Sequence, residues 1–263
     1  NVADLKPQIV ITEGNAYVKK DTYTFIKQVD NYTPYQFSDL KNIFYSVLNQ
    51  GWEEFTFYCP TEYSTCLQDV SKLSNNEILL SDINNYVHPY NSYVTIKTLY
   101  DDSGEVTLKV NHLYSDEEIL QIDKEIDTIM SQVLNDQMSL TDKIKALHDY
   151  VINETKYDTK RASTGASPFD SNRIVGLLHY HYAICSGYAD TMASSSTHVW
   201  NAVYINNTWL HLDLTFDDPV TSSGKDMLDH SYFLIDTPTL EELDRINKSE
   251  HQFDKEVYGE LKK

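Results

Sequence analysis

One cysteine stands where the sequence changes from an apolar stretch to residues that favour a helix. Cys185 lies in AICSGYADTM (183–192), and Ser186 and Gly187 follow it. At the start of a helix, unpaired backbone N–H groups and the helix dipole favour a thiolate. A thiolate is a strong nucleophile, so Cys185 is a candidate for covalent catalysis. Taken alone, a buried structural cysteine is the commoner explanation.

A predicted β-hairpin downstream carries a histidine and an aspartate. HVWNAVYI (198–205) and TWLHLDLT (208–215) predict two strands joined by an Asn206-Asn207 turn. Pairing about that turn opposes 198 with 215 and 200 with 213. His198 and Asp213 then face one side as diagonal neighbours, with backbones about 7–8 Å apart. The carboxylate can hold one imidazole nitrogen and leave the other for a thiol, which predicts a Cys185–His198–Asp213 arrangement.

Each of these residues also has a simpler explanation. In the simpler explanation, His198 is an ordinary strand histidine and Asp213 caps the turn at TFDDP (215–219). Trp200 shares the strand face of His198 and either walls the active site or packs in the core. Metal binding through three nearby histidines is a further alternative. No known ligand spacing includes them, so we expect neither metal nor cofactor. These histidines are His179, His181 and His211.

The rest of the chain reads as a mixture of helices and antiparallel strands. Apolar residues at helical spacing predict helices over 36–50, 77–86 and 116–134, and a capping signal at Ser139 precedes another helix. Alternation predicts strands over 54–58, 92–100 and 105–114, the last two joined by a DDSG turn. The sequence predicts an α+β protein with an accessory domain over 1–112, a helical connector over 113–138 and a catalytic domain over 139–263.

Charge limits the classes of partner. The chain has 263 residues with 21 basic and 40 acidic side chains, a formal net charge of −19. Nucleic acids require a basic face, so we expect no nucleic-acid partner. No apolar run is long enough to cross a bilayer, so we expect no membrane insertion.

Two further cysteines bear on location. Cys59 and Cys66 are spaced either for a short disulfide or for half of a zinc site, although no second ligand pair accompanies them. A disulfide indicates an oxidising compartment, and we expect an extracellular or cell-surface protein. The sequence begins at Asn1 without a methionine or signal peptide, so we expect a trimmed chain.

Together, these segments resemble the transglutaminase-like superfamily, whose core is papain-related. The resemblance rests on CSGYA, on HVWNAVYINNTWLHLDLTFDDP and on flanking segments, and it covers about residues 139–255. It implies a helix carrying the cysteine packed on an antiparallel sheet. It also implies that Cys185 is the nucleophile, His198 the general acid and base, and Asp213 the residue that orients His198.

The sequence departs from that family in one place. Cys185 and His198 are only 13 positions apart, whereas relatives place a helix, a loop and a further strand between them. An eight-residue helix carries the chain about 12 Å away, and five residues return at most about 17 Å. We expect either a shortened core or residues missing between Met192 and Ser196, and favour the latter.

The function implied is thiol acyl transfer. Cys185 would form a thioester from a glutamine carboxamide of a protein or peptide, with its own N–H and an upstream donor holding the oxyanion. An amine acceptor gives crosslinking, and water gives a cysteine peptidase or amidase. The alternative from another class is an inactive cell-surface binding protein.

Overall fold

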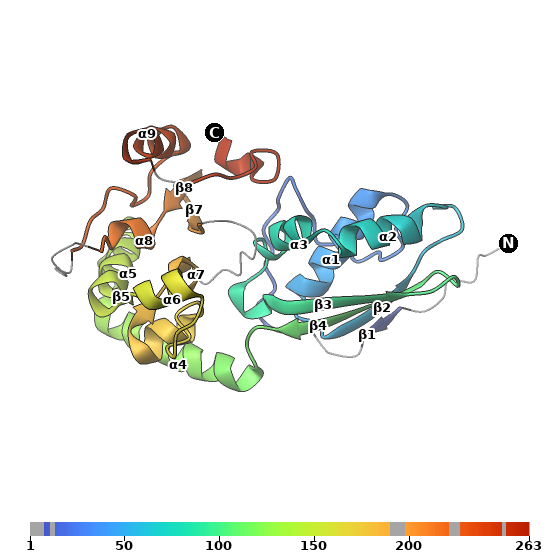
Figure 1. Ribbon diagram of the computed structural model, residues 1–263, viewed down its shortest axis with the longest axis horizontal. Helices are drawn as coiled ribbons and strands as arrows, with labels where there is room; N and C mark the ends of the chain where they lie inside the picture. The colour runs from blue at the N-terminus through green and yellow to red at the C-terminus, as the bar shows by residue number, and fades with distance from the viewer. Residues whose placement is uncertain (1–7, 11–13, 190–197, 221–226, 249–250, 263) are drawn as a thin grey trace. The chain divides into compact units, whose positions relative to one another are not determined.

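The described residues form two compact units, the first ending at Ser115 and the second beginning at Asp116. The computed structural model describes residues 8–10, 14–189, 198–220, 227–248 and 251–262 (Figure 1). Helices and strands are mixed in both units, as expected for an α+β protein. None of the helices in these ranges is long and apolar enough to span a membrane.

The first unit is an antiparallel sheet with helices on one face (Figure 1). The sheet has the strand order β1-β2-β4-β3. Its elements are β1 (Ile9–Val10), α1 (Phe37–Asn49), β2 (Glu54–Tyr58), α2 (Cys66–Ser74), α3 (Glu77–Asn84), η1 (Pro89–Asn91), β3 (Tyr93–Tyr100) and β4 (Glu105–His112).

Helical spacing in the sequence correctly predicts α1 and α3, and alternation correctly predicts β2, β3 and β4. The apolar face of α1 and the inward side chains of β2 make the core, where Phe44, Phe55 and Phe57 are almost completely buried. The helix α2 was not predicted. It starts at Cys66, and its apolar positions Val70 and Leu73 are buried.

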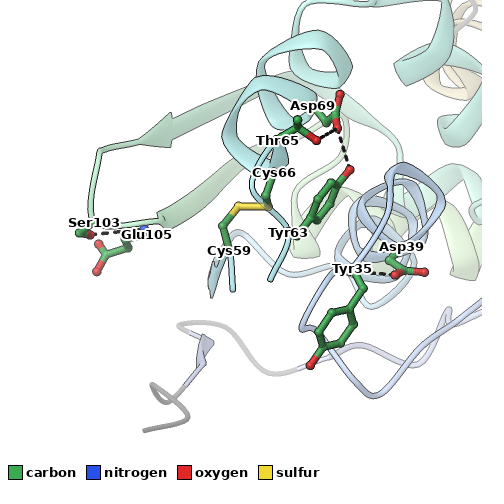
Figure 2. Close-up of a disulfide and its surroundings, with 9 residues drawn as sticks. All are labelled: Tyr35, Asp39, Cys59, Tyr63, Thr65, Cys66, Asp69, Ser103 and Glu105. Carbon is green, nitrogen blue, oxygen red and sulfur yellow. Dashed lines mark hydrogen bonds between the residues drawn. A yellow bond between two sulfur atoms is a disulfide. The ribbon is translucent and has the colours of Figure 1, made fainter. Parts of the chain in front are cut away.

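A disulfide joins the end of β2 to the start of α2. Figure 2 shows Cys59 and Cys66 bonded, with a Cα–Cα distance of 5.8 Å. Between them, Tyr63 and Thr65 both donate hydrogen bonds to Asp69 of α2, which holds the enclosed loop against the helix. Of the two alternatives for these cysteines, the structure has the disulfide.

The second unit combines helices with short pairs of strands. It contains a two-stranded parallel pair, β5-β6, and an antiparallel hairpin, β7-β8. Its elements are α4 (Asp116–Val133), α5 (Leu140–Glu154), β5 (Lys156–Tyr157), α6 (Thr159–Thr164), η2 (Gly176–Tyr180), β6 (Tyr182–Ala183), α7 (Cys185–Ala189), β7 (Asn201–Ile205), β8 (Thr208–Leu212), α8 (Leu214–Asp217), α9 (Thr237–Asn247) and η3 (Gly259–Lys262).

One small core joins the helices of this unit to the hairpin. Ser139 and Asp142 form a capping box that starts α5, as the sequence predicts. From α5, Ile152 packs with Tyr188 of α7 and Leu212 of β8. The described part of α7 also contacts β6, η2 and α8. The packing of a complete cysteine-bearing helix on an antiparallel sheet therefore stays a prediction.

The hairpin has the predicted turn and register but is shorter than predicted. Asn201 opposes Leu212, and Ile205 opposes Thr208. Residues 198–200 precede β7, and the chain after Leu212 turns into α8 instead of continuing as a strand. The strand ends early because Asp213 caps α8: its side chain accepts hydrogen bonds from the backbone of Thr215 and Phe216. The segment between β5 and β6 contains α6 and η2, for which no helix was predicted.

Candidate functional site

Cys185 is the first residue of α7 and is half-buried. The residue before it is fixed by a hydrogen bond from the Ile184 N–H to the carbonyl of Ser171, 2.8 Å long. Two residues after it, Gly187 passes so close to the same carbonyl that a Cβ would lie 2.2 Å from the oxygen. The segment at Ser171 therefore determines where α7 begins and how Cys185 is presented.

The structure brings His198 and Asp213 together. Nε2 of His198 lies 2.5 Å from Oδ2 of Asp213, a hydrogen bond in which the imidazole N–H donates to the carboxylate. The two side chains are in contact, but not as diagonal neighbours on a ladder. Neither residue belongs to the β7–β8 ladder.

His198 also contacts the cysteine, and its pKa reflects both partners. Burial would lower that pKa, but hydrogen bonds to Asp213 and to Cys185, together with their charges, raise it to about 9. Because Nε2 faces Asp213, Nδ1 is the nitrogen left for the thiol. An imidazolium beside a thiol favours the thiolate. The His198–Asp213 hydrogen bond is thus a direct contact, and Cys185 enters through its effect on the pKa of His198.

The two oxygens of Asp213 have different partners. Oδ1 accepts the backbone N–H groups of Thr215 and Phe216, at 2.8 and 3.1 Å. Oδ2 accepts from His198 and also from Nε2 of His251, at 2.8 Å. Burial would raise the pKa of Asp213, but these two imidazoles lower it through hydrogen bonds and charge. Both explanations considered for Asp213 are therefore correct: it caps a turn of helix and holds His198.

His251 was not predicted as a site residue. Its side chain is completely buried, and its Nδ1 lies 2.6 Å from Oδ1 of Asp244 in α9. Rings of Trp200, Phe216 and Tyr232 surround its imidazole at centroid distances of 4.9, 4.8 and 5.2 Å. The sequence offers little sign of this role, because residue 251 lies far along the chain from His198 and the segment has no periodic pattern.

Trp200 is held by a chain of hydrogen bonds. Its indole N–H donates to Nδ1 of His211 over 2.9 Å, so the proton of that imidazole is on Nε2, which faces Thr237 at 2.9 Å. Thr237 in turn donates to the carbonyl of Leu261. Burial, and then the charge of His251, lower the pKa of His211 to about 4, so the imidazole in this series of hydrogen bonds stays neutral. The Trp200 ring lies nearly parallel to that of His198, with centroids 5.9 Å apart.

Tyr157 faces the same region from β5. It pairs with Ala183, two residues before the cysteine. Burial raises the pKa of Tyr157, and the charges of Cys185, Asp158 and Asp213 raise it further. The pairing of Tyr157 with Ala183 and the effect of these charges on its pKa make Tyr157 a candidate neighbour of Cys185.

Among the residues that the structure describes, two groups of side chains have the composition of a metal site. One is His198, Asp213 and His251, and the other is His148, Asp149 and His230. In each, the histidine and aspartate atoms lie 2.5 to 2.9 Å apart, closer than the roughly 3.3 Å between ligand atoms around a tetrahedral zinc. These are the distances of imidazole–carboxylate hydrogen bonds.

The second group already contains a cation. Lys145 lies 2.5 Å from Asp149 and 2.9 Å from His230. Burial would raise the pKa of Asp149, but hydrogen bonds from Lys145, His148 and His230 lower it to about 2. Of the histidines weighed for metal binding, His179 contacts Glu125, and His211 contacts Trp200 and Thr237.

The short passage from Cys185 to His198 stays a prediction. The expected break between Met192 and Ser196 lies outside the described residues, which end at Ala189 and resume at His198.

Comparisons with known proteins add a weak structural likeness. No model of a protein family matches this sequence, and no curated protein matches it. Among solved structures, one similar chain is described as the crystal structure of a TGase. It is 15% identical, with a TM-score of 0.34 over 47% of this chain and 44% of that one. This chain thus matches less than half of that chain's length, and a likeness of this size carries no argument about function.

Proposed function

We propose that the second unit is a transglutaminase-like thiol acyltransferase. Cys185 is the nucleophile, His198 the general acid and base, and Asp213 the residue that orients His198. The observation that carries the proposal is the position of His198. One ring nitrogen is held by the Asp213 carboxylate at 2.5 Å, and Asp213 and Cys185 both raise the pKa of the imidazole, to about 9, which keeps it protonated at neutral pH.

The first half-reaction forms a thioester. The Cys185 thiolate attacks the carbonyl carbon of a glutamine carboxamide, forming a C–S bond and placing the negative charge on oxygen. As the carbonyl re-forms, the C–N bond breaks and His198 gives its Nδ1 proton to the leaving ammonia. The neutral imidazole then takes a proton from an incoming amine, whose nitrogen attacks the thioester carbon, and the thiolate leaves.

Two donors are available for the oxyanion. As the first residue of α7, Cys185 has a backbone N–H with no acceptor inside the helix. The second donor is the phenol of Tyr157, whose hydroxyl stays protonated because its pKa is raised. Donors aimed at the developing charge lower the barrier to acyl transfer. Trp200 is the proposed wall of the site, because its orientation is fixed by His211.

Water is the competing acceptor. Cys185 is only half-buried, which favours hydrolysis alongside transfer to amines. The same three residues would then act as a cysteine peptidase or amidase. A binding protein that keeps the fold without activity needs none of these contacts.

The division of the chain and its location complete the proposal. We propose that 1–112 is an accessory domain, 113–138 a helical connector and 139–263 the catalytic domain. The Cys59–Cys66 disulfide supports an extracellular or cell-surface location, because such bonds persist in oxidising compartments.

The test compares wild type with Cys185→Ala on a glutamine-containing protein and a labelled primary amine. Amine incorporation that disappears in the variant supports the transferase. Release of ammonia or new peptide ends, without incorporation, supports the hydrolase instead. Iodoacetamide labelling detects the binding-protein alternative: Cys185 would then react no faster than an ordinary thiol.

A further inference from the structure

His251 links the proposed triad to a second carboxylate. His251 lies between two carboxylates. Its Nδ1 is 2.6 Å from Oδ1 of Asp244, and its Nε2 donates a hydrogen bond to Oδ2 of Asp213 over 2.8 Å. The backbone N–H of His251 also donates to Oδ2 of Asp244. Asp213 is thus hydrogen-bonded to the buried His251, and His251 is hydrogen-bonded to Asp244 near the C-terminal end of α9.

The number of protons in this row of hydrogen bonds follows from its donors and acceptors. Oδ2 of an ionised Asp213 only accepts, so both imidazoles facing it present an N–H, and the Nε2 of His251 carries a proton. The short contact from Nδ1 to Asp244 requires a second proton between those two atoms. Together, His251 and Asp244 hold one proton more than a neutral imidazole and a carboxylate would. That extra proton adds positive charge to the His251–Asp244 pair beside Asp213.

The surroundings of His251 fix it in this role. Its side chain is completely buried, and aromatic rings contact it on several sides, so it has little freedom to rotate. The titratable and charged groups that face it are Asp213 ahead of α8, Asp244 of α9, His198 ahead of β7, His211 of β8 and Tyr232. Of these, His211 stays neutral because its pKa is lowered to about 4.

We propose that His251, held by Asp244, positions Asp213 and offsets part of its negative charge, and so sets the pH at which His198 loses its proton. His198 and His251 share one carboxylate oxygen, and their ring centroids are 5.1 Å apart. The extra proton of the His251–Asp244 pair disfavours a proton on His198, and His251 competes with His198 for the same acceptor. This assignment rests on the proposed function, in which His198 must both give and take a proton. His251 and Asp244 are positioning residues, since neither contacts Cys185 in that scheme.

The test measures the titration of His198 directly, by NMR of histidine-labelled protein, together with the pH profile of Cys185 alkylation. His251→Gln keeps a donor toward Asp213 but carries no charge, so the midpoint of His198 should rise by about one pH unit. Asp244→Asn should move it in the same direction by less, because it removes the carboxylate that holds the extra proton. Asp244 is one-fifth exposed, so this variant serves if His251→Gln does not fold.

His148→Gln is the matched control. His148 is also buried, and it also bridges two aspartates, but its partners are Asp149 and Asp217. This variant should lower stability without moving the His198 midpoint. If both His251→Gln and Asp244→Asn leave the midpoint where His148→Gln leaves it, His251 is merely structural and the inference is wrong. Ordinary reactivity of wild-type Cys185 would instead contradict the proposed function, while the NMR titration would still decide the role of His251.

Discussion

His198 and Asp213 are joined by a 2.5 Å hydrogen bond although neither is part of the β-ladder between them. The ladder ends at the Asn201–Leu212 pair, and both side chains extend from the irregular segments just beyond it. The hairpin brings these segments together, and the cap of α8 then fixes the carboxylate. The His198–Asp213 bond therefore depends on where the β7–β8 ladder ends and where α8 begins.

Asp213→Asn separates the charge of this residue from its capping role. Asparagine still caps a helix, but its amide presents N–H groups to His198 and His251 and carries no charge. We expect kcat to fall by about 10³- to 10⁴-fold, as for other orienting aspartates. Asp236→Asn, at the N-cap of α9, is the control, since Asp236 caps through the same kind of bond to Thr239. Equal losses in the two variants would show that Asp213 acts only as a cap.

The raised pKa of His198 predicts how stability changes with pH. A folded-state pKa of about 9, against about 6.5 in the unfolded chain, means that its contribution is fully present below about pH 6.5. It should be lost progressively as the pH rises from there through 9. Urea unfolding of wild type and His198→Gln at pH 6, 8 and 10 measures this contribution. The free energies of unfolding should converge as the pH increases, and a constant difference would contradict the prediction.

Gly187→Ala should disturb the position of Cys185. The added Cβ would lie 2.2 Å from the Ser171 carbonyl oxygen and 3.2 Å from the Cβ of Ala183, so the backbone must move. We expect a loss of about 2–3 kcal/mol in the free energy of unfolding. Alkylation of Cys185 should also slow.

Gly165→Ala provides the comparison. Nothing lies within 4 Å of its new Cβ, and only the positive φ of 73° makes it unfavourable. Its cost should be about 1 kcal/mol, with no change at Cys185. A Gly187→Ala protein as stable and reactive as this control would mean that the Ser171 contact does not fix α7.

Tyr157→Phe tests the proposed oxyanion donor. Loss of the hydroxyl should lower kcat by about 10²-fold with little change in KM, because the donor bonds to charge that develops only in the transition state. Tyr182→Phe is the matched variant: Tyr182 is in the paired strand and stacks on Phe169. Steady-state kinetics on one substrate compare them, and an unchanged kcat in Tyr157→Phe would remove it from the mechanism.

The Cys59–Cys66 disulfide should stabilise the first unit only. It closes a loop with a sequence separation of 7, for which the loss of chain entropy predicts about 2–3 kcal/mol. Replacing both cysteines by alanine should lower the thermal midpoint of that unit. The alkylation rate of Cys185 should stay the same, and a large change in that rate would show that the bond affects the second unit as well.

Regular elements were predicted well, and the reasons are local. The apolar spacing in α1 and the alternation in β2 to β4 depend on residues adjacent in sequence, so a period identifies them. The pairing register of β7 with β8 followed from the turn alone. By contrast, the hairpin was extended too far, because the alternation continues through Leu214 while the capping preference of Asp213 ends the strand.

The parts of the site that sequence reasoning missed depend on contacts between distant segments. His251 and Asp244 reach Asp213 from α9 and the segment after it, and nothing in their own neighbourhood signals that meeting. Tyr157 was overlooked because a two-residue strand is too short to show a period. His211 was considered only as a metal ligand, whereas its place on β8 makes it the acceptor for Trp200.

The buried position of His251 has a consequence for how the protein matures. A ribosome makes the thiol of Cys185 well before it makes His251, and Asp213 has only part of its bonding until that later segment folds into place. In a newly made chain, His198 should therefore keep its proton up to a higher pH until the segment after α9 has docked.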